Sequence, residues 1–185
     1  MIAIAMGRWA ARMAAVLAIA TVLACPAAAQ YAAGDTITGR VVGVYDGDTL
    51  TVLTADQRKV RIRVADIDAP ERKQPFGDRS KRMLSDLAFG RHAEVAVDDV
   101  DRYHRPVGRV RVGGTNVNAA RVRQGGAWVF TRYNRDPSLV VVEAEAQAAG
   151  RGLWRLPDGE RIPPWEWRAA KKDERARRRA AGTGR

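Results

Sequence analysis

The 185-residue sequence predicts a small β-barrel that carries a few helices, an α+β fold. Three observations predict it: five short stretches that alternate apolar and polar residues, only a few segments of helical periodicity, and turn residues between neighbouring stretches. Hydrophobic residues make up 46% of the chain, enough for a core. Five short strands with few helices favour a barrel over a sandwich or a doubly wound sheet.

The predicted strands follow one another along the first two thirds of the chain. The first two, residues 36–45 and 49–53, flank a tight acidic corner. In the third, residues 60–64, three apolar residues alternate with Arg61 and Arg63, so we expect both arginines on one face. Two more strands are predicted from their alternation and are joined by a charged hairpin: 92–97 and 107–112.

Three helices are expected in the same part of the chain. Residues 78–89 form the first, with Asp78 as its cap, and residues 118–124 form a short second helix. Asp136 is expected to cap the third, with Pro137 at its first position. The third helix is expected to bury four apolar side chains and to end at Gly150: Leu139, Val142, Ala146 and Ala149.

The N-terminus resembles an export signal. Two arginines precede an apolar run at residues 13–24, and small residues follow at 27–29, so we expect a signal peptide over 1–29. The run is shorter than the roughly 20 residues of a membrane span, so no stable span is expected after cleavage. A retained anchor and a lipoprotein signal ending at Cys25, the only cysteine, remain alternatives.

The rest of the chain divides into a body and a tail. Residues 30–35 are interpreted as a linker and 36–154 as one folded domain, followed by a tail at 155–185. Residues 163–167 are a proline- and tryptophan-rich segment that could pack on the body. From 168 to 185 there are eight basic and two acidic residues, which indicates either a solvated or helical tail or a non-specific nucleic-acid arm.

The charge of the chain indicates an anionic partner. The formal net charge is +11, and loss of the two arginines of the signal peptide lowers it to +9. Nucleic acid is the first expectation and anionic lipid the second.

Three motifs carry the candidate chemistry. Each alone is ordinary, a hairpin turn or a solvated charged loop, but together they suggest a metal-dependent phosphodiesterase site. Carboxylates suit calcium or magnesium better than zinc, and neither of the two histidines, His92 and His104, has a metal-ligand spacing. Arginines can grip a phosphate through two N–H bonds. The motifs are Asp46-Gly47-Asp48-Thr49, Arg63 to Glu71, and Asp101 to Arg105.

The same motifs, in this order, resemble the signature of the staphylococcal nuclease (thermonuclease) family. The likeness continues through residues 117–125 and 143–147 to Leu153-Trp154, and so covers about 36–154. It implies a five-stranded oligonucleotide-binding-type barrel with three helices. It also implies an exported, monomeric, calcium-dependent hydrolase of DNA and RNA that leaves 3′-phosphate ends.

The resemblance assigns roles to individual residues. It implies that Asp48 and Asp68 supply carboxylates to Ca²⁺ and that Ala69 supplies its backbone carbonyl. It implies that Arg63 and Arg105 hold the phosphate and stabilise its developing charge.

Further roles carried by the resemblance have alternatives. Glu71 is the implied general base, although a carboxylate beside calcium can also act through electrostatics. Asp46 is expected to lie outside the direct ligands and to orient water near them. Tyr103 and Tyr133 could contact sugar or base, or could simply pack.

The sequence departs from the family pattern at several positions. Ala69 replaces a threonine, and His104 replaces a glycine just before the catalytic arginine, which leaves the hairpin conformation open. Arg109 is an alternative phosphate ligand if Arg105 points away. The segment 72–77 is shorter than the corresponding loop, and Asp66 is an additional acid near the site.

Two other classes of protein compete with the enzyme. One is a non-catalytic nucleic-acid-binding module on the same barrel, which we expect to have lost site residues, whereas this chain keeps all five charged ones. Aromatic residues make up only 6% of the chain, which argues against a stacking platform for single strands. The other is a surface lipoprotein or scaffold that binds anionic envelope polymers.

Overall fold

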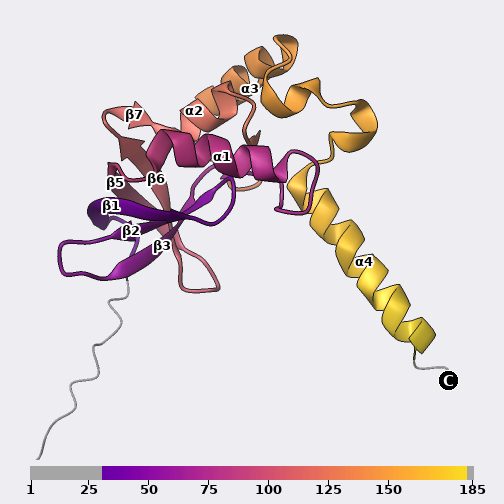
Figure 1. The fold of residues 1–185 in the computed structure, drawn as a ribbon, viewed down its shortest axis with the longest axis horizontal. Helices are drawn as coiled ribbons and strands as arrows, with labels where there is room; N and C mark the ends of the chain where they lie inside the picture. Colours follow the sequence, from indigo (N-terminus) through magenta and orange to yellow (C-terminus); the bar gives the residue numbers. More distant parts are fainter. Residues whose placement is uncertain (1–30, 183–185) are drawn as a thin grey trace, which may run out of the picture.

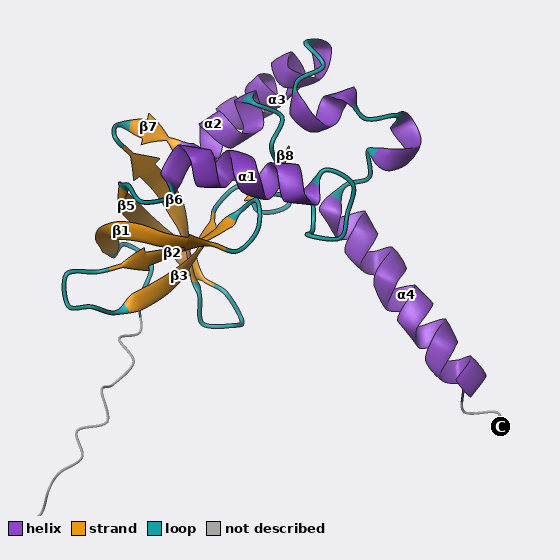
Figure 2. Cartoon of the chain, viewed as in Figure 1, coloured by secondary structure: helices purple, strands orange, loops and turns teal. Residues whose placement is uncertain are grey.

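The computed structural model describes residues 31–182, so the predicted signal peptide lies outside the described residues. Five strands form a closed barrel in the order β3-β2-β1-β5-β6, in which neighbours are antiparallel and a parallel pairing of β3 with β6 closes the circle (Figure 2). The predicted barrel is confirmed. Its strands are β1 (Thr36–Val44), β2 (Thr49–Leu53), β3 (Lys59–Val64), β5 (His92–Val100) and β6 (Pro106–Val112).

The parallel closure decides where the site can form. Arg63 pairs with Val107 and Val64 with Gly108, so the end of β3 lies beside the start of β6. The charged hairpin between β5 and β6 therefore lies next to Arg63, although some forty residues of chain separate them. Three short strands were not predicted. The first, β7 (Thr115–Asn116), pairs antiparallel with β6, and the other two, β4 (Ile67–Asp68) and β8 (Trp128–Val129), pair with each other.

The core fills the barrel interior with branched apolar side chains. Along β3, Ile62 and Val64 are fully buried while Arg61 is exposed, which confirms the expected alternation. Burial of each such side chain contributes about 1.5–3 kcal/mol, so the barrel is a rigid base for the loops at its edge. The buried barrel residues include Ile37, Val41, Leu50, Val52, Val95, Val110 and Val112.

The three predicted helices are confirmed, and a fourth occupies the tail. They are α1 (Gly77–Ala88), α2 (Val117–Arg123), α3 (Ser138–Ala148) and α4 (Pro164–Gly182), with two 3₁₀ turns at η1 (Gly152–Arg155) and η2 (Asp158–Glu160). Helix α1 lies across the barrel, and α4 projects away from the body (Figure 1). Among residues 31–182, no helix is both long enough and apolar enough to cross a membrane.

The expected cap of the first helix is wrong, and the second helix begins one residue earlier than predicted. Helix α1 begins at Gly77 after Phe76, whose φ is 70°, and Asp78 lies inside the first turn without capping it. Helix α2 begins one residue before Asn118 and is capped by Asn116, whose side chain accepts the Ala119 N–H. A capping side chain can sit at several neighbouring polar positions, which explains errors of one or two residues.

Asn118 is buried for a different purpose. Its Oδ1 accepts the Val110 N–H at 3.0 Å and its Nδ2 donates to the Ala65 carbonyl at 2.7 Å. It therefore ties α2 to β6 and to the turn after β3.

The third helix differs from the prediction at both ends. It begins at Ser138, after Pro137, and Asp136 accepts the Ser138 N–H at 3.0 Å. Leu139 and Ala146 are buried as expected, but Ala149 is exposed, because the helix has already ended at Ala148 and the chain turns away.

Candidate active site

Two buried carboxylates form the centre of the site. Asp48 ends the acidic corner between β1 and β2, and Asp68 lies in β4; they are 6% and 1% exposed. The Arg63 guanidinium lies between them, 3.3 Å from Asp48 Oδ2 and 3.1 Å from Asp68 Oδ1. The structure thus brings together three of the residues that the sequence selected.

Arg63 is held firmly in this position. Its NH1 also donates to the backbone carbonyls of Val64 and Ile67, both at 2.9 Å. These partners fix the guanidinium in one position beside the two acids.

The acidic corner is a packing feature rather than a simple hairpin turn. Gly47 has no positive φ, but a Cβ there would collide with the Ser80 hydroxyl oxygen and lie 2.6 Å from the Ala69 Cβ. The Ala69 N–H donates to Asp48 Oδ2 at 2.7 Å, so the peptide at Ala69 lies directly against this carboxylate. Glycine at 47 allows the corner to approach both α1 and the 68–69 segment.

Arg121, which the sequence did not single out, supports the corner from behind. It is fully buried in α2, its Nε donates to the Gly47 carbonyl at 3.3 Å, and its NH2 donates to the carbonyls of Ser80 and Gly126. Burial lowers its pKa to about 10, although the charge of Asp48 opposes this. Periodicity alone places residue 121 on the apolar face of a short helix, so no local signal marks it as a site support.

Burial and the charge of neighbouring carboxylates raise the pKa values of two acids of the site. Burial, and then the neighbouring Asp48 charge, raise the pKa of Asp46 to about 7, and Asp46 Oδ1 accepts the Asp48 N–H at 3.1 Å. Burial also raises the pKa of Asp68, while Arg168 and Arg63 oppose the shift. Such a pocket favours a cation.

Glu71 lies at the open side of the same acids and contacts a residue from the far end of the chain. Its Oε1 is 2.8 Å from Arg168 NH1 on α4, and Arg168 NH2 is 2.6 Å from Asp68 Oδ2. Burial lowers the pKa of Arg168, but its bonds to Asp68 and then to Glu71 outweigh this effect and raise the pKa. The sequence placed Arg168 in a tail apart from the site, because nothing local indicates a contact over 100 residues.

Arg105 comes from the hairpin between β5 and β6 and does not touch the acids. Its Nε and NH2 bind Asp101 Oδ2 at 2.8 and 2.7 Å. Although burial opposes it, hydrogen bonds from Arg105 and Tyr103 lower the pKa of Asp101. His104 adopts a φ of 59°, in the left-handed region that glycine favours, so the backbone takes a glycine-like conformation at this position although the residue is histidine.

A groove of about 670 Å³ joins Arg63 and Arg105. Tyr103 and Tyr133 also line it and are 63% and 59% exposed, although Tyr133 packs edge-on against Phe130 and the Arg105 guanidinium lies over the Tyr103 ring. Arg109 is bound to Asp98 at 2.8 Å and does not line this groove in the described structure.

A second groove begins on the other side of the hairpin. It shares Tyr103 and Arg105 with the first and continues past Tyr31 and the basic residues of 58–61. Acidic as well as basic side chains line the first groove, whereas the lining of the second holds basic and no acidic side chains, so the second matches a polyanion better. The acids of the first groove are Asp66, Asp98, Asp99 and Asp101.

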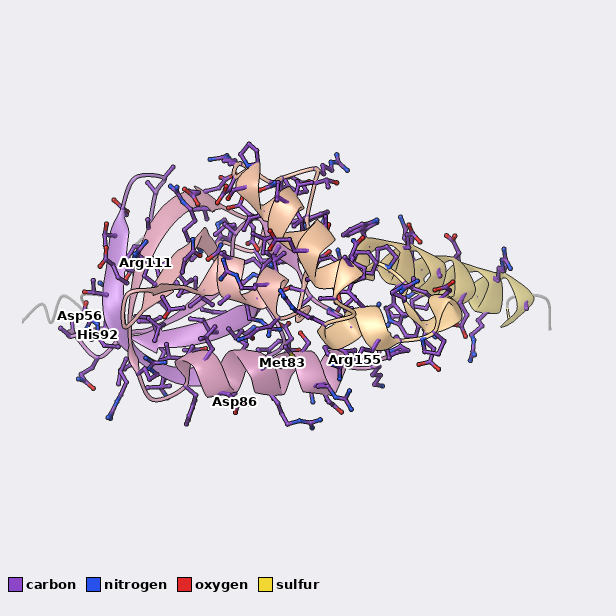
Figure 3. The ribbon with its side chains drawn as sticks, turned by 90° about the horizontal axis from the view of Figure 1, so that it is seen from above. Asp56, Met83, Asp86, His92, Arg111 and Arg155 are labelled. Carbon is purple, nitrogen blue, oxygen red and sulfur yellow. The ribbon has the colours of Figure 1, made fainter. Side chains whose placement is uncertain are left out.

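The side-chain atoms of the acids that could bind a metal are all oxygens. In the part of the chain that the structure describes, no three His, Cys, Asp or Glu side chains form a metal cluster on their own. His92 lies at the opposite end of the barrel from α4 (Figure 3). Two buried carboxylates that already share one cationic group, with backbone beside them, fit a hard cation such as calcium better than zinc.

A closed barrel with acids and arginines beside a basic groove defines the class of small-barrel nucleic-acid enzymes. Residues 61–156 match the family model described as "Staphylococcal nuclease homologue". The chain belongs to this family, which confirms the resemblance drawn from the motifs.

Named relatives agree with the family. An "Uncharacterized endonuclease" of Escherichia coli O157:H7 is 48% identical over 137 residues, which cover 73% of this chain and 87% of the relative. A similarly named protein of Haemophilus influenzae is 42% identical over 135 residues, which cover 73% of this chain and 75% of the relative. A "Micrococcal nuclease" of Shigella flexneri is 38% identical over 175 residues, 89% of this chain and 95% of the relative. These matches support a nuclease, and so a hydrolase.

Proposed function

We propose that this protein is a calcium-dependent nuclease that hydrolyses phosphodiester bonds of both DNA and RNA and leaves 3′-phosphate ends. One observation carries the proposal: a single guanidinium, Arg63, joins the buried Asp48 and Asp68 at the edge of a groove that Arg105 also lines. The formal net charge of +11 supports a polyanionic substrate.

The metal would be held by Asp48, Asp68 and the backbone carbonyl of Ala69. When bound, a divalent cation supplies electrostatic stabilisation for the charge that develops on the phosphoryl oxygens. Burial is the chief cause that raises the pKa values of Asp68 and of the neighbouring Asp46, so their ionised forms are poorly solvated and a bound cation would stabilise them.

The arginines bind the phosphate. Arg63 and Arg105 approach the groove from a strand and from the neighbouring hairpin, and each can donate two N–H bonds to non-bridging oxygens. To bind the phosphate, Arg63 gives up its contacts with Asp48 and Asp68. Arg105 likewise gives up its contact with Asp101.

Glu71 acts as the base. It takes a proton from the water that attacks phosphorus, while the bond between phosphorus and the 5′ oxygen breaks and that oxygen takes up a proton from solvent water. Tyr103 and Tyr133 hold sugar or base along the groove.

A cleavage assay of residues 30–185 on plasmid DNA and on RNA tests this function. Cleavage should require calcium, stop on chelation, and leave 3′-phosphate ends. Arg63→Ala, Arg105→Ala and Glu71→Gln should each slow cleavage by at least about 10²-fold, whereas Arg109→Ala, outside the groove, should not. Equal cleavage in excess chelator would refute the metal role, and wild-type rates in all three variants would refute the site. Binding without cleavage would leave a non-catalytic module.

We also propose export to the periplasm or the medium and a monomeric state. The apolar run at 13–24 with small residues at 27–29 supports export. Mass spectrometry of the native protein should give an N-terminus at Gln30; a lipid on Cys25 would favour the lipoprotein alternative instead.

A further inference from the structure

Arg168 makes the strongest contacts to the acids from outside the barrel. Its NH2 lies 2.6 Å from Asp68 Oδ2, and its NH1 lies 3.2 Å from Asp68 Oδ1 and 2.8 Å from Glu71 Oε1. The guanidinium therefore covers both oxygens of one proposed metal ligand and one oxygen of the proposed base. Paired N–H···O bonds of this kind are among the strongest in proteins.

The first turn of α4 is docked, so this contact is built into the fold. Trp165 stacks on Phe130 with ring centroids 5.5 Å apart and an interplanar angle of 9°, and it meets Trp128 edge-on at 6.1 Å. Arg168 follows three residues later and so lies on the same face of the helix as Trp165. The Gln74 side chain also donates to the Ile162 carbonyl just before the helix.

Beyond this turn α4 is largely exposed. Nearly all residues of 169–182 are exposed, and the helix extends away from the body (Figure 1). The docked turn can therefore leave the site by breaking one aromatic cluster and one set of ion pairs, without unfolding the barrel core.

Arg168 and a metal would need the same oxygens. Calcium takes carboxylate oxygens at roughly 2.3–2.6 Å, and the guanidinium already bonds both oxygens of Asp68. Arg63 also contacts Asp68 Oδ1, at 3.1 Å, so a metal on this carboxylate would be a third cation beside the two guanidinium groups. The Asp68 side chain is only 2% exposed, which limits the screening of that repulsion by solvent.

We propose that Arg168 is an internal competitor of the metal: it holds Asp68 and Glu71 in the metal-free protein, and metal binding displaces it together with the first turn of α4. The inference rests on the proposed metal role of Asp48 and Asp68. Its consequence is that the chain sets its own calcium threshold and keeps Glu71 engaged until the metal arrives.

Calorimetric titration of the full chain with CaCl₂, without nucleic acid, tests the competition. Arg168→Met keeps the length of the side chain and removes its charge, so it should bind calcium about tenfold more tightly than wild type. Arg175→Met removes the same charge at an exposed position of the same helix and should leave the affinity within about twofold. Trp165→Ala, which undocks the turn without removing a charge, should tighten binding in the same direction.

Hydrogen exchange provides a second measurement. In the wild type, calcium should speed amide exchange in residues 164–170, while the barrel strands stay protected. Unchanged or weaker calcium affinity in Arg168→Met, with measurable binding by the wild type, would overturn the competition and leave the proposed nuclease intact. No calcium binding by any variant would instead overturn the proposed metal role, and the competition with it.

Discussion

Arg121 is the residue on which the shape of the acidic corner depends most. Its guanidinium reaches three backbone carbonyls from three segments, at Gly47, Ser80 and Gly126, in a fully buried position. In the described structure its NH1 has no hydrogen-bond partner. Burying a guanidinium with an unpaired N–H group is unfavourable, so the role of Arg121 is better explained by its support of the corner than by packing in the core.

Arg121→Ala should lower the free energy of unfolding by about 2–5 kcal/mol, because it leaves a cavity and buried carbonyls without donors. Arg121→Met fills most of the space and should remain destabilised, since it restores no donor. Urea denaturation measures both, with the exposed Arg123→Ala as control, expected within about 0.5 kcal/mol of wild type. If Arg121→Met matches the wild type, packing alone explains the residue.

At the scale of elements, a relay of contacts connects α3 to the site. Glu143 on α3 accepts the Val129 N–H at 2.8 Å, and Val129 in β8 pairs with Ile67 in β4, next to Asp68. Burial raises the pKa of Glu143, and the bond from Val129 opposes the shift only in part. The helix therefore positions the strand that carries Asp68 with a carboxylate that is costly to ionise.

This pKa shift predicts a pH dependence of stability. Because the folded state holds the Glu143 proton more tightly than the unfolded chain, this group favours folding at low pH and loses that contribution as pH rises through 4.5 and beyond. Glu143→Gln keeps an oxygen acceptor and removes the titration, so its stability relative to wild type should increase from about pH 4 to 7. Thermal unfolding across this range measures it, with the exposed Glu145→Gln as control. A relative stability that does not change with pH would contradict the prediction.

At the scale of the whole molecule, the tail has two parts with different tasks. The turn from Pro164 to Arg168 packs on Trp128 and Phe130 and contacts the acids of the site, as expected for a proline- and tryptophan-rich segment, whereas the rest of α4 is basic and exposed. From the sequence we interpreted residues 168–185 as one basic segment. In the structure Arg168 belongs instead to the docked turn that contacts the acids.

Deletion of residues 171–185 should leave the body folded and weaken DNA binding mainly at low salt. The plot of log affinity against log salt should become less steep by about 0.9 for each phosphate that the shortened chain no longer neutralises. Filter binding at several salt concentrations measures this slope. The triple variant Lys172→Gln, Arg175→Gln, Arg177→Gln keeps the length of the helix and removes three positive charges, so it tests the effect of charge alone. An unchanged slope in both proteins would show that the exposed helix does not bind nucleic acid.

Local pattern alone determined much of this protein. Alternation over 60–64 predicted a strand with arginines outward, and three ordered motifs predicted that Asp48, Asp68 and Arg63 would meet. These features are readable because strand periodicity and motif order are properties of short segments.

Only the tertiary structure decided the rest. The β3–β6 closure, the Arg121 contact with Gly47 over 74 residues and the Arg168 contact with Asp68 over 100 residues join segments that no local pattern relates. Burial of a charged side chain depends on what packs over it, and the Trp165–Phe130 stack that places Arg168 at the acids joins two segments that are distant in the sequence.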